Sequence, residues 1–114
     1  MGNSIQDEFE RLRDEVISMF TLFESFDLEG RHLVRSRKLR AHYDKVRVKQ
    51  LRELDELNQL KLKASTPKKA LECASRFRAL LKKHTKQLNS IMDRLVPLMR
   101  SSMRDAEKKK NESG

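Results

Sequence analysis

Hydrophobic side chains recur at alternating intervals of four and three residues through the first part of the chain. This spacing keeps them on one stripe of an α-helix, and it predicts a helix over residues 4–27. Gly30 follows this segment and suits a left-handed turn residue at its end. The seven stripe positions are Ile5, Phe9, Leu12, Val16, Met19, Phe23 and Phe26.

Additional apolar residues widen that stripe beyond what a seam between two helices requires. They are Ile17, Phe20 and Leu22. The first helix is therefore expected to contact more than one neighbour. The Phe-rich part of its face is the candidate apolar surface for a partner chain, and it comprises Ile17, Phe20, Phe23 and Phe26.

Two further helices are predicted over residues 33–63 and 67–107. The second helix carries Leu39, Tyr43 and Val46 on its apolar stripe, with Gln50 interrupting it. Ser65 or Thr66 is a good N-cap for the third helix, with Pro67 at its first position. Pro97 is expected to kink this helix or to end its straight part, and residues 108–114 form a polar tail.

Three long amphipathic segments joined by short connections indicate an all-α fold in a single domain, residues 1–107. The chain is expected to form an antiparallel three-helix bundle. The alternative is a coiled-coil-like hairpin whose third helix folds back or contacts a partner. Because only 5% of the 114 residues are aromatic and 38% are charged, a β-sandwich or barrel is excluded.

The expected location is intracellular, either cytoplasmic or nuclear. No apolar run approaches the ~18 residues of a membrane span, and no signal segment begins the chain. A single cysteine, Cys73, cannot form an internal disulfide, which agrees with a reducing compartment. A secreted or transmembrane protein is not expected.

Charge is distributed unevenly along the chain, whose net charge is +9. Residues 1–30 contain two basic and eight acidic side chains, whereas residues 31–49 contain eight basic side chains and one acid, Asp44. Residues 67–114 add thirteen basic side chains against five acids. An acidic helix is thus followed by two basic ones.

Basic residues of the second helix divide into two flanks beside its apolar stripe. One flank, called here the basic ladder, keeps the 4, 3 spacing, and acids of the first helix are expected to pair with it: Glu24 with Arg35, Asp14 with Lys45 and Glu10 with Lys49. The ladder consists of Arg31, Arg35, Lys38, His42, Lys45 and Lys49. The other flank finds few acids in the first helix, so with the third helix it is expected to form a basic surface: Arg37, Arg40, Arg47, Arg76, Arg78, Lys82, Lys83 and Lys86.

Catalysis is not expected, because the chain has no phosphate-binding glycine loop, nucleophile elbow or isolated carboxylate pair. The three histidines and Cys73 have no metal-site spacing, so we expect no metal, cofactor or small-molecule substrate. His84 lies in the seam, where a buried histidine bonded to a neighbour is expected and a pH-sensitive switch is the alternative. Thr66, within "TPKK", is a candidate site for a proline-directed kinase.

The sequence therefore predicts a non-catalytic helical interaction module, a subunit or adaptor of a larger assembly that packs through its heptad seams. Its partner would be another helical protein or a second copy. The alternative is a sequence-independent binder of nucleic acid or anionic membrane through the basic face of the second and third helices.

Overall fold

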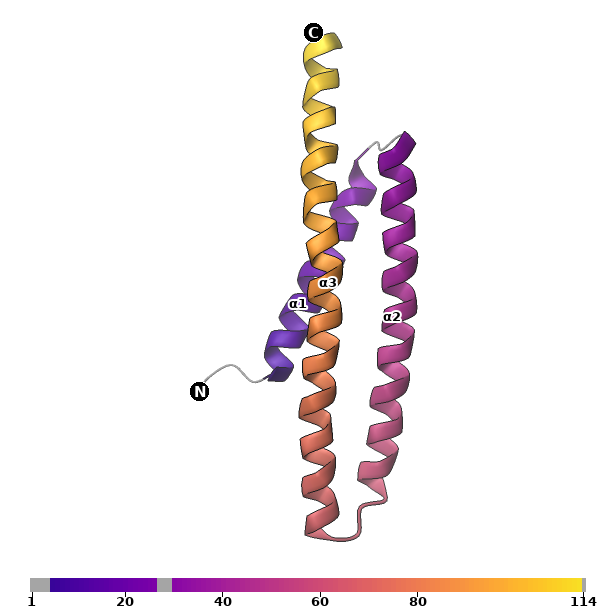
Figure 1. The fold of residues 1–114 in the computed structure, drawn as a ribbon, viewed down its shortest axis with the longest axis vertical. Helices are drawn as coiled ribbons and strands as arrows, with labels where there is room; N and C mark the ends of the chain where they lie inside the picture. The colour runs from indigo at the N-terminus through magenta and orange to yellow at the C-terminus, as the bar shows by residue number, and fades with distance from the viewer. Residues whose placement is uncertain (1–4, 27–29, 114) are drawn as a thin grey trace.

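A computed structural model shows three helices, each antiparallel to the next, forming an elongated bundle of 70 × 30 × 17 Å (Figure 1). The structure describes residues 5–26 and 30–113. The helices are α1 (Ile5–Ser25), α2 (Gly30–Leu62) and α3 (Pro67–Ser113). The predicted all-α three-helix bundle is confirmed, since α3 runs back along both α1 and α2.

The core lies where the three apolar stripes meet. Val16, Leu88 and Leu95 have no exposed surface, and Phe20 and Phe23 are each only 2% exposed. Burial of a single such side chain contributes about 1.5–3 kcal/mol. The remaining buried members of this core are Phe9, Leu39, Tyr43, Leu81, Ile91 and Leu98.

Two local signals in the sequence explain the helix starts. Gly30 begins α2 with a φ of 56°, the left-handed conformation expected of it. Thr66 caps α3, because its Oγ1 accepts a hydrogen bond from the Lys69 backbone N–H at 3.2 Å. Asn3 and Ser4, which the sequence suggests as caps of the first helix, lie outside the described residues, as does the segment 27–29.

The third helix is longer than its predicted range. It continues through Pro97, with Leu95 and Leu98 on either side packed in the core. It then extends to Ser113, so most of the predicted polar tail is helical. Lys and Glu are good helix formers, and Lys108 to Lys110 lie near the helix C-terminus, where the helix dipole favours positive charge.

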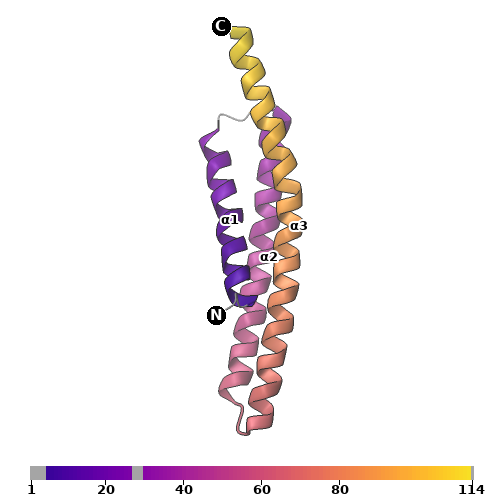
Figure 2. The same cartoon turned by 90° about the vertical axis from the view of Figure 1, so that its left-hand side faces the viewer.

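The helices differ in length, and this difference leaves one end of the bundle with two layers. α2 has 33 residues and α1 only 21, which leaves on the order of 18 Å of α2 beyond α1. Figure 2 shows that α1 begins at mid-height while α2 and α3 continue together to their connection. No described helix has an apolar stretch of the length needed to cross a membrane.

Candidate functional site

The predicted apolar partner surface on α1 belongs largely to the protein's own core. Phe20 and Phe23 face α2 and α3 and are buried, while Phe26 is half-buried against the same cluster. Only Ile17, at 40% exposed, remains accessible. These four residues therefore do not form one open face, because folding of α3 onto α1 covers the phenylalanines.

Two arginines expected on the outer basic surface instead contact aromatic rings of the core. The Arg40 guanidinium lies 5.2 Å from the ring centre of Phe20 and 5.6 Å from that of Tyr43. The Arg47 guanidinium lies 5.6 Å from the ring centre of Phe9. Such cation–π contacts contribute about 0.5–2 kcal/mol each, so Arg40 and Arg47 bind α2 to α1.

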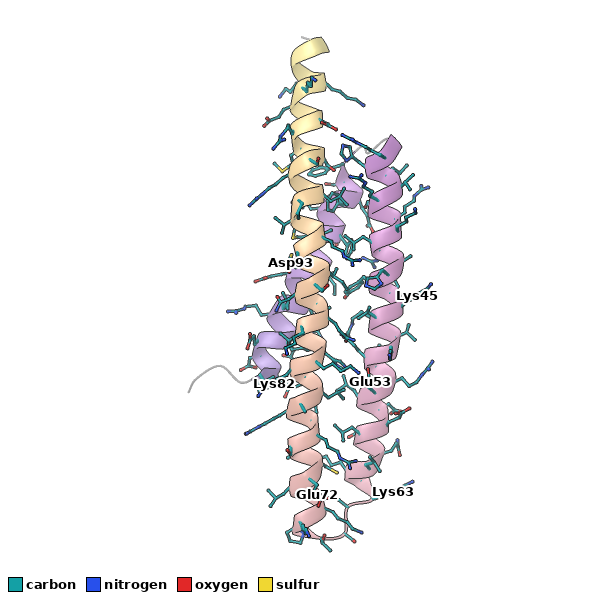
Figure 3. All side chains as sticks on the ribbon, in the orientation of Figure 1. Lys45, Glu53, Lys63, Glu72, Lys82 and Asp93 are labelled. Atoms are coloured by element: carbon teal, nitrogen blue, oxygen red, sulfur yellow. The ribbon has the colours of Figure 1, made fainter. Side chains whose placement is uncertain are left out.

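The basic ladder, expected to pair with α1, instead lies at the surface, and all six of its side chains are exposed. Within the part of the chain that the structure describes, none of them lies within ion-pair distance of a carboxylate. The expected pairs with Glu10, Asp14 and Glu24 do not form. Figure 3 shows Lys45 extending outward from α2.

Which side of α2 faces α1 explains why Arg40 and Arg47 contact α1 while the basic ladder does not. Arg40 and Arg47 are on the flank of α2 that meets α1, whereas the ladder is on the flank next to α3. Arg35, Lys38 and His42 of the ladder border a groove of about 350 Å³, called here the ladder groove. Its remaining lining residues are Leu39, Arg94, Pro97 and Leu98.

The other predicted basic residues remain at the surface. Arg37 on α2 is exposed, as are the five predicted residues of α3, which are Arg76, Arg78, Lys82, Lys83 and Lys86. Among these, Lys83 donates a hydrogen bond of 2.8 Å to Glu53 Oε2 on α2. The interface between α2 and α3 therefore partly neutralises Lys83, whereas Arg37 keeps its predicted exposure.

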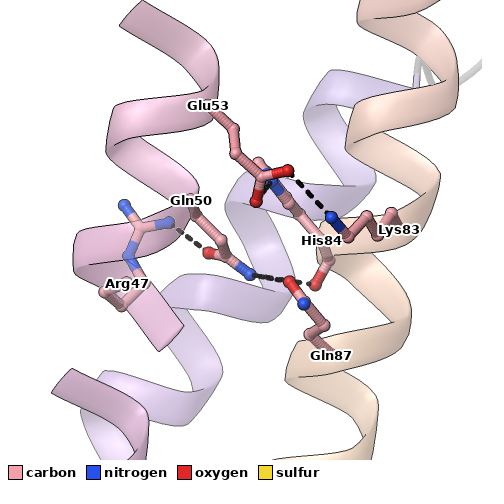
Figure 4. A network of polar contacts seen from close by, with 6 residues as sticks. All are labelled: Arg47, Gln50, Glu53, Lys83, His84 and Gln87. Atoms are coloured by element: carbon pink, nitrogen blue, oxygen red, sulfur yellow. Dashed lines mark hydrogen bonds and ion pairs between the residues drawn. The ribbon is translucent and has the colours of Figure 1, made fainter. Parts of the chain in front are cut away.

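A polar network crosses the interface of α2 and α3 (Figure 4). The fully buried Gln50 donates from Nε2 to the His84 carbonyl oxygen at 3.4 Å and to Gln87 Oε1 at 3.0 Å. Its own Oε1 accepts a hydrogen bond from Arg47 at 2.7 Å. Because Arg47 also lies over Phe9, the network connects all three helices.

The His84 ring has unsatisfied polar atoms beside this network. The ring is fully buried, and neither ring nitrogen has a hydrogen-bond partner. Nε2 lies 3.5 Å from Glu53 Oε1, which is within ion-pair distance. The two groups form an ion pair only when the imidazole is protonated. Burial lowers the pKa of His84, and the Glu53 carboxylate opposes that change. The expected hydrogen bond from the ring is therefore absent, although the predicted burial is present.

The pKa of Glu53 is also lowered. The hydrogen bond that Glu53 accepts from Lys83 is the main cause of this lowered pKa, with a smaller contribution from His84. Near the start of α2, His32 Nε2 hydrogen-bonds to the Asp105 carboxylate on α3. These cross-links fix the register of α2 against α3.

An apolar groove, called here the hairpin groove, opens below the N-terminal end of α1, where α2 and α3 continue without it. It has a volume of about 600 Å³. Its walls carry Leu51, Leu54 and Leu57 from α2, and Ala70, Cys73, Ala74 and Phe77 from α3. Leu51 is 55% exposed. Cys73, one residue from the apolar seam of α3, is half-buried at this groove.

No group of three or more His, Cys, Asp or Glu side chains within residues 5–26 and 30–113 has a metal-binding arrangement. Comparison of the chain with protein-family models, curated proteins and solved structures gives no match. The grooves and charged surfaces of the bundle are therefore the basis for assigning a function.

The cap at Thr66 yields a first testable prediction. Thr66→Ala should lower the free energy of unfolding by about 1 kcal/mol, because the Lys69 N–H loses its acceptor. Thr66→Asp should retain most of the stability, since a carboxylate also caps a helix. Urea unfolding followed by circular dichroism measures both, with Ser65→Ala as the matched control. Equal losses for Thr66→Ala and Ser65→Ala would contradict the cap.

Phosphorylation of Thr66 remains a proposal. Its side chain is exposed, and a phosphate at this helix N-terminus would lie beside Lys68 and Lys69. The helix dipole and both lysines favour negative charge there. Incubation with a proline-directed kinase and mass spectrometry tests it, with Thr66→Ala as the negative control.

Proposed function

We propose that this protein is a non-catalytic helical interaction module that receives an amphipathic helix from another protein in the hairpin groove. One observation carries this proposal: the third helical layer is missing where α2 and α3 extend beyond α1. Higher in the bundle α1 lies alongside α2 and α3, whereas among the described residues only α2 and α3 reach the lower end.

The chemistry of the groove supports a helical occupant. The apolar walls come from two antiparallel helices, as do the walls that α1 packs against higher in the bundle. Ala70, Cys73 and Ala74 are small, so a third helix can approach α3 closely. Asp55 and Lys61 of α2 and Arg78 of α3 border the apolar floor with charges that can fix the orientation of the helix.

Site-specific photo-crosslinking in the native source tests this function. A photoreactive side chain at Leu51, 55% exposed in the groove, should crosslink to a helical segment of another protein. The matched control is Leu22, 45% exposed on the outer face of α1, which should give no such product. Mass spectrometry of the crosslinked peptides identifies the segment.

A blocking variant makes the test quantitative. Ala74→Arg places a long charged side chain in the groove and should reduce the Leu51 crosslink at least about tenfold. Ala79→Arg, exposed on α3 but outside the groove, should leave the crosslink unchanged. Crosslinks that survive Ala74→Arg, or that join only copies of this chain, would contradict the proposed function.

The alternative function, binding of nucleic acid or anionic membrane, would use the basic ladder rather than this groove. The exposure of all six ladder residues favours some anionic ligand for that surface. The class of ligand depends on which side chains lie beside the cations, and apolar residues adjoin the ladder.

A further inference from the structure

The basic ladder follows one side of α2 from Arg31 to Lys49, a little over half the length of this helix. From Arg31 to Lys49 it extends over ~27 Å at the helical rise. All six side chains are exposed, and no described carboxylate lies within ion-pair distance of them. The acidic helix α1 meets the other flank of α2, where Arg40 and Arg47 lie over aromatic rings of α1, so its carboxylates do not pair with the ladder.

The charge is concentrated at the ladder groove. Arg35 and Lys38 of α2 face it together with Arg94 of α3, and His42 borders it. No acidic side chain is found among its described lining residues. Like charges that share one groove repel each other, so a ligand carrying several negative groups would be favoured there.

The floor of this groove is apolar. Leu39 and Leu98, each 8% exposed, form the floor together with the exposed Pro97. Val34 and Val48, 51% and 58% exposed, lie on the outer side of α2 and not in this groove. The surface therefore offers cations in a straight row together with apolar contacts, rather than charge alone.

We infer that the ladder and its groove bind an acidic amphipathic helix of a partner protein. A helix alongside α2 presents side chains with the same 4, 3 period as the ladder, so its carboxylates can face successive cations. Its apolar side chains can contact Pro97 and the floor of the ladder groove. The ladder lies apart from the hairpin groove, so this binding extends the proposed function to a second surface and does not require the first.

Other polyanions use these features less well. Single-stranded nucleic acid is held by stacking on exposed aromatic rings, but Tyr43, the aromatic residue of α2, is 4% exposed. A phosphate backbone or a lipid headgroup gains nothing from an apolar floor. The +9 net charge of the chain also disfavours a second copy as the partner.

A defined peptide tests the inference directly. The probe is a fluorescent helical peptide as long as α1, with Glu repeating at 4, 3 spacing beside a Leu stripe. Its control has the same composition in scrambled order, so that Glu residues share no face. At about 0.15 M salt, fluorescence anisotropy should show the ordered peptide binding at least about tenfold more tightly than the scrambled one.

Charge reversal locates the site. The triple variant Arg35→Glu, Lys38→Glu and Arg94→Glu should weaken binding of the ordered peptide at least about tenfold. Its matched control reverses three exposed residues elsewhere on α3, Arg76, Lys82 and Lys86, and should bind within about threefold of the wild type. Circular dichroism checks that both variants remain helical. Ala74→Arg should not change peptide binding, which separates this site from the hairpin groove.

Several outcomes would overturn the inference. These are equal affinity for the ordered and scrambled peptides, no binding of the ordered peptide, or equal losses in the two triple variants. A short DNA duplex, or vesicles of phosphatidylcholine and phosphatidylserine, bound more tightly than the peptide through the same three residues would assign the ladder to a polyanion instead. Self-association in sedimentation that disappears in the ladder variant would assign it to a second copy.

Discussion

Phe20→Ala should lower the free energy of unfolding by about 3–5 kcal/mol, a larger loss than we expect from any other single substitution proposed for this protein. The Phe20 side chain is 2% exposed, and its ring centre lies 5.3 Å from that of Tyr43. Removal of the ring leaves a cavity among three helices and also takes away the surface on which Arg40 rests. Urea unfolding followed by circular dichroism measures the change.

Ile17→Ala is the matched control, since Ile17 is three residues from Phe20 on the same helix but is 40% exposed. It should cost about 1 kcal/mol or less. The contrast between the two variants distinguishes a core residue from a surface residue on a helix whose apolar pattern alone makes them equivalent. Equally small decreases in the free energy of unfolding for both variants would mean that Phe20 lies outside the core. Phe20 would then belong to the partner surface predicted from the sequence.

The period of the apolar residues was sufficient to predict three helices, but it left open whether the third packs on its own chain or on a partner. Each stripe needs a neighbour to cover it, and short connections bring the stripes of one chain together. Thr66 marked the start of α3 because it caps that helix, whereas Gly30, expected to end the first helix, is instead the first residue of α2, three residues before the predicted start. The C-terminal extent of α3 was harder to predict, since a polar helix end has no apolar period to reveal it.

The charged surfaces were harder to predict for a geometric reason. An apolar stripe has two flanks, and helical spacing does not say which flank of α2 meets α1. That choice depends on the handedness of the bundle, which is a property of the packed molecule. The structure therefore places Arg40 and Arg47 on aromatic rings and exposes the ladder, the reverse of the sequence interpretation.

The polar network had a partial signal in the sequence. Gln50 and His84 both occupy seam positions, where a polar side chain must find a partner or remain unsatisfied. Their association required the register of α2 against α3, which the connection at residues 63–66 and the pairing of Glu53 with Lys83 establish. The apolar period alone could identify Gln50 and His84 as polar residues in an apolar seam. It could not predict that they lie next to each other.

The wild-type protein should lose stability on acidification through His84. Burial lowers the pKa of this histidine in the folded protein, whereas the unfolded chain titrates near its ordinary value of about 6.5. Between those two pKa values the unfolded chain binds a proton that the folded chain does not. The free energy of unfolding is therefore highest above about pH 6.5, falls as the pH decreases below it, and stops falling below the folded pKa.

The charged groups around the ring determine how large this loss is. Glu53 of α2 favours the protonated imidazole, whereas Lys83 of α3 and Arg47 of α2 oppose it. From α1 the neighbour is the Phe9 ring, whose centre lies 6.0 Å from that of His84. Glu53 has a lowered pKa of its own, so its contribution is lost only below about pH 4.5, outside the histidine window.

His84→Leu isolates the histidine contribution. At pH 7.5 this substitution should change the free energy of unfolding by less than about 1.5 kcal/mol, because it exchanges an unsatisfied buried ring for an apolar side chain of similar size. As the pH decreases from about 6.5, the variant should gain stability relative to the wild type, by at most about 1.4 kcal/mol per pH unit. Urea unfolding at a series of pH values measures this difference.

The exposed His42 supplies the matched control, since His42→Leu removes a histidine that the fold does not bury. That variant should keep the acid sensitivity of the wild type. A direct measurement is NMR titration of the His84 ring in the folded protein, which should give a pKa below that of the unfolded chain. A value at or above it would mean that Glu53 outweighs burial, and protonation of His84 would then stabilise the interface between α2 and α3 rather than weaken it.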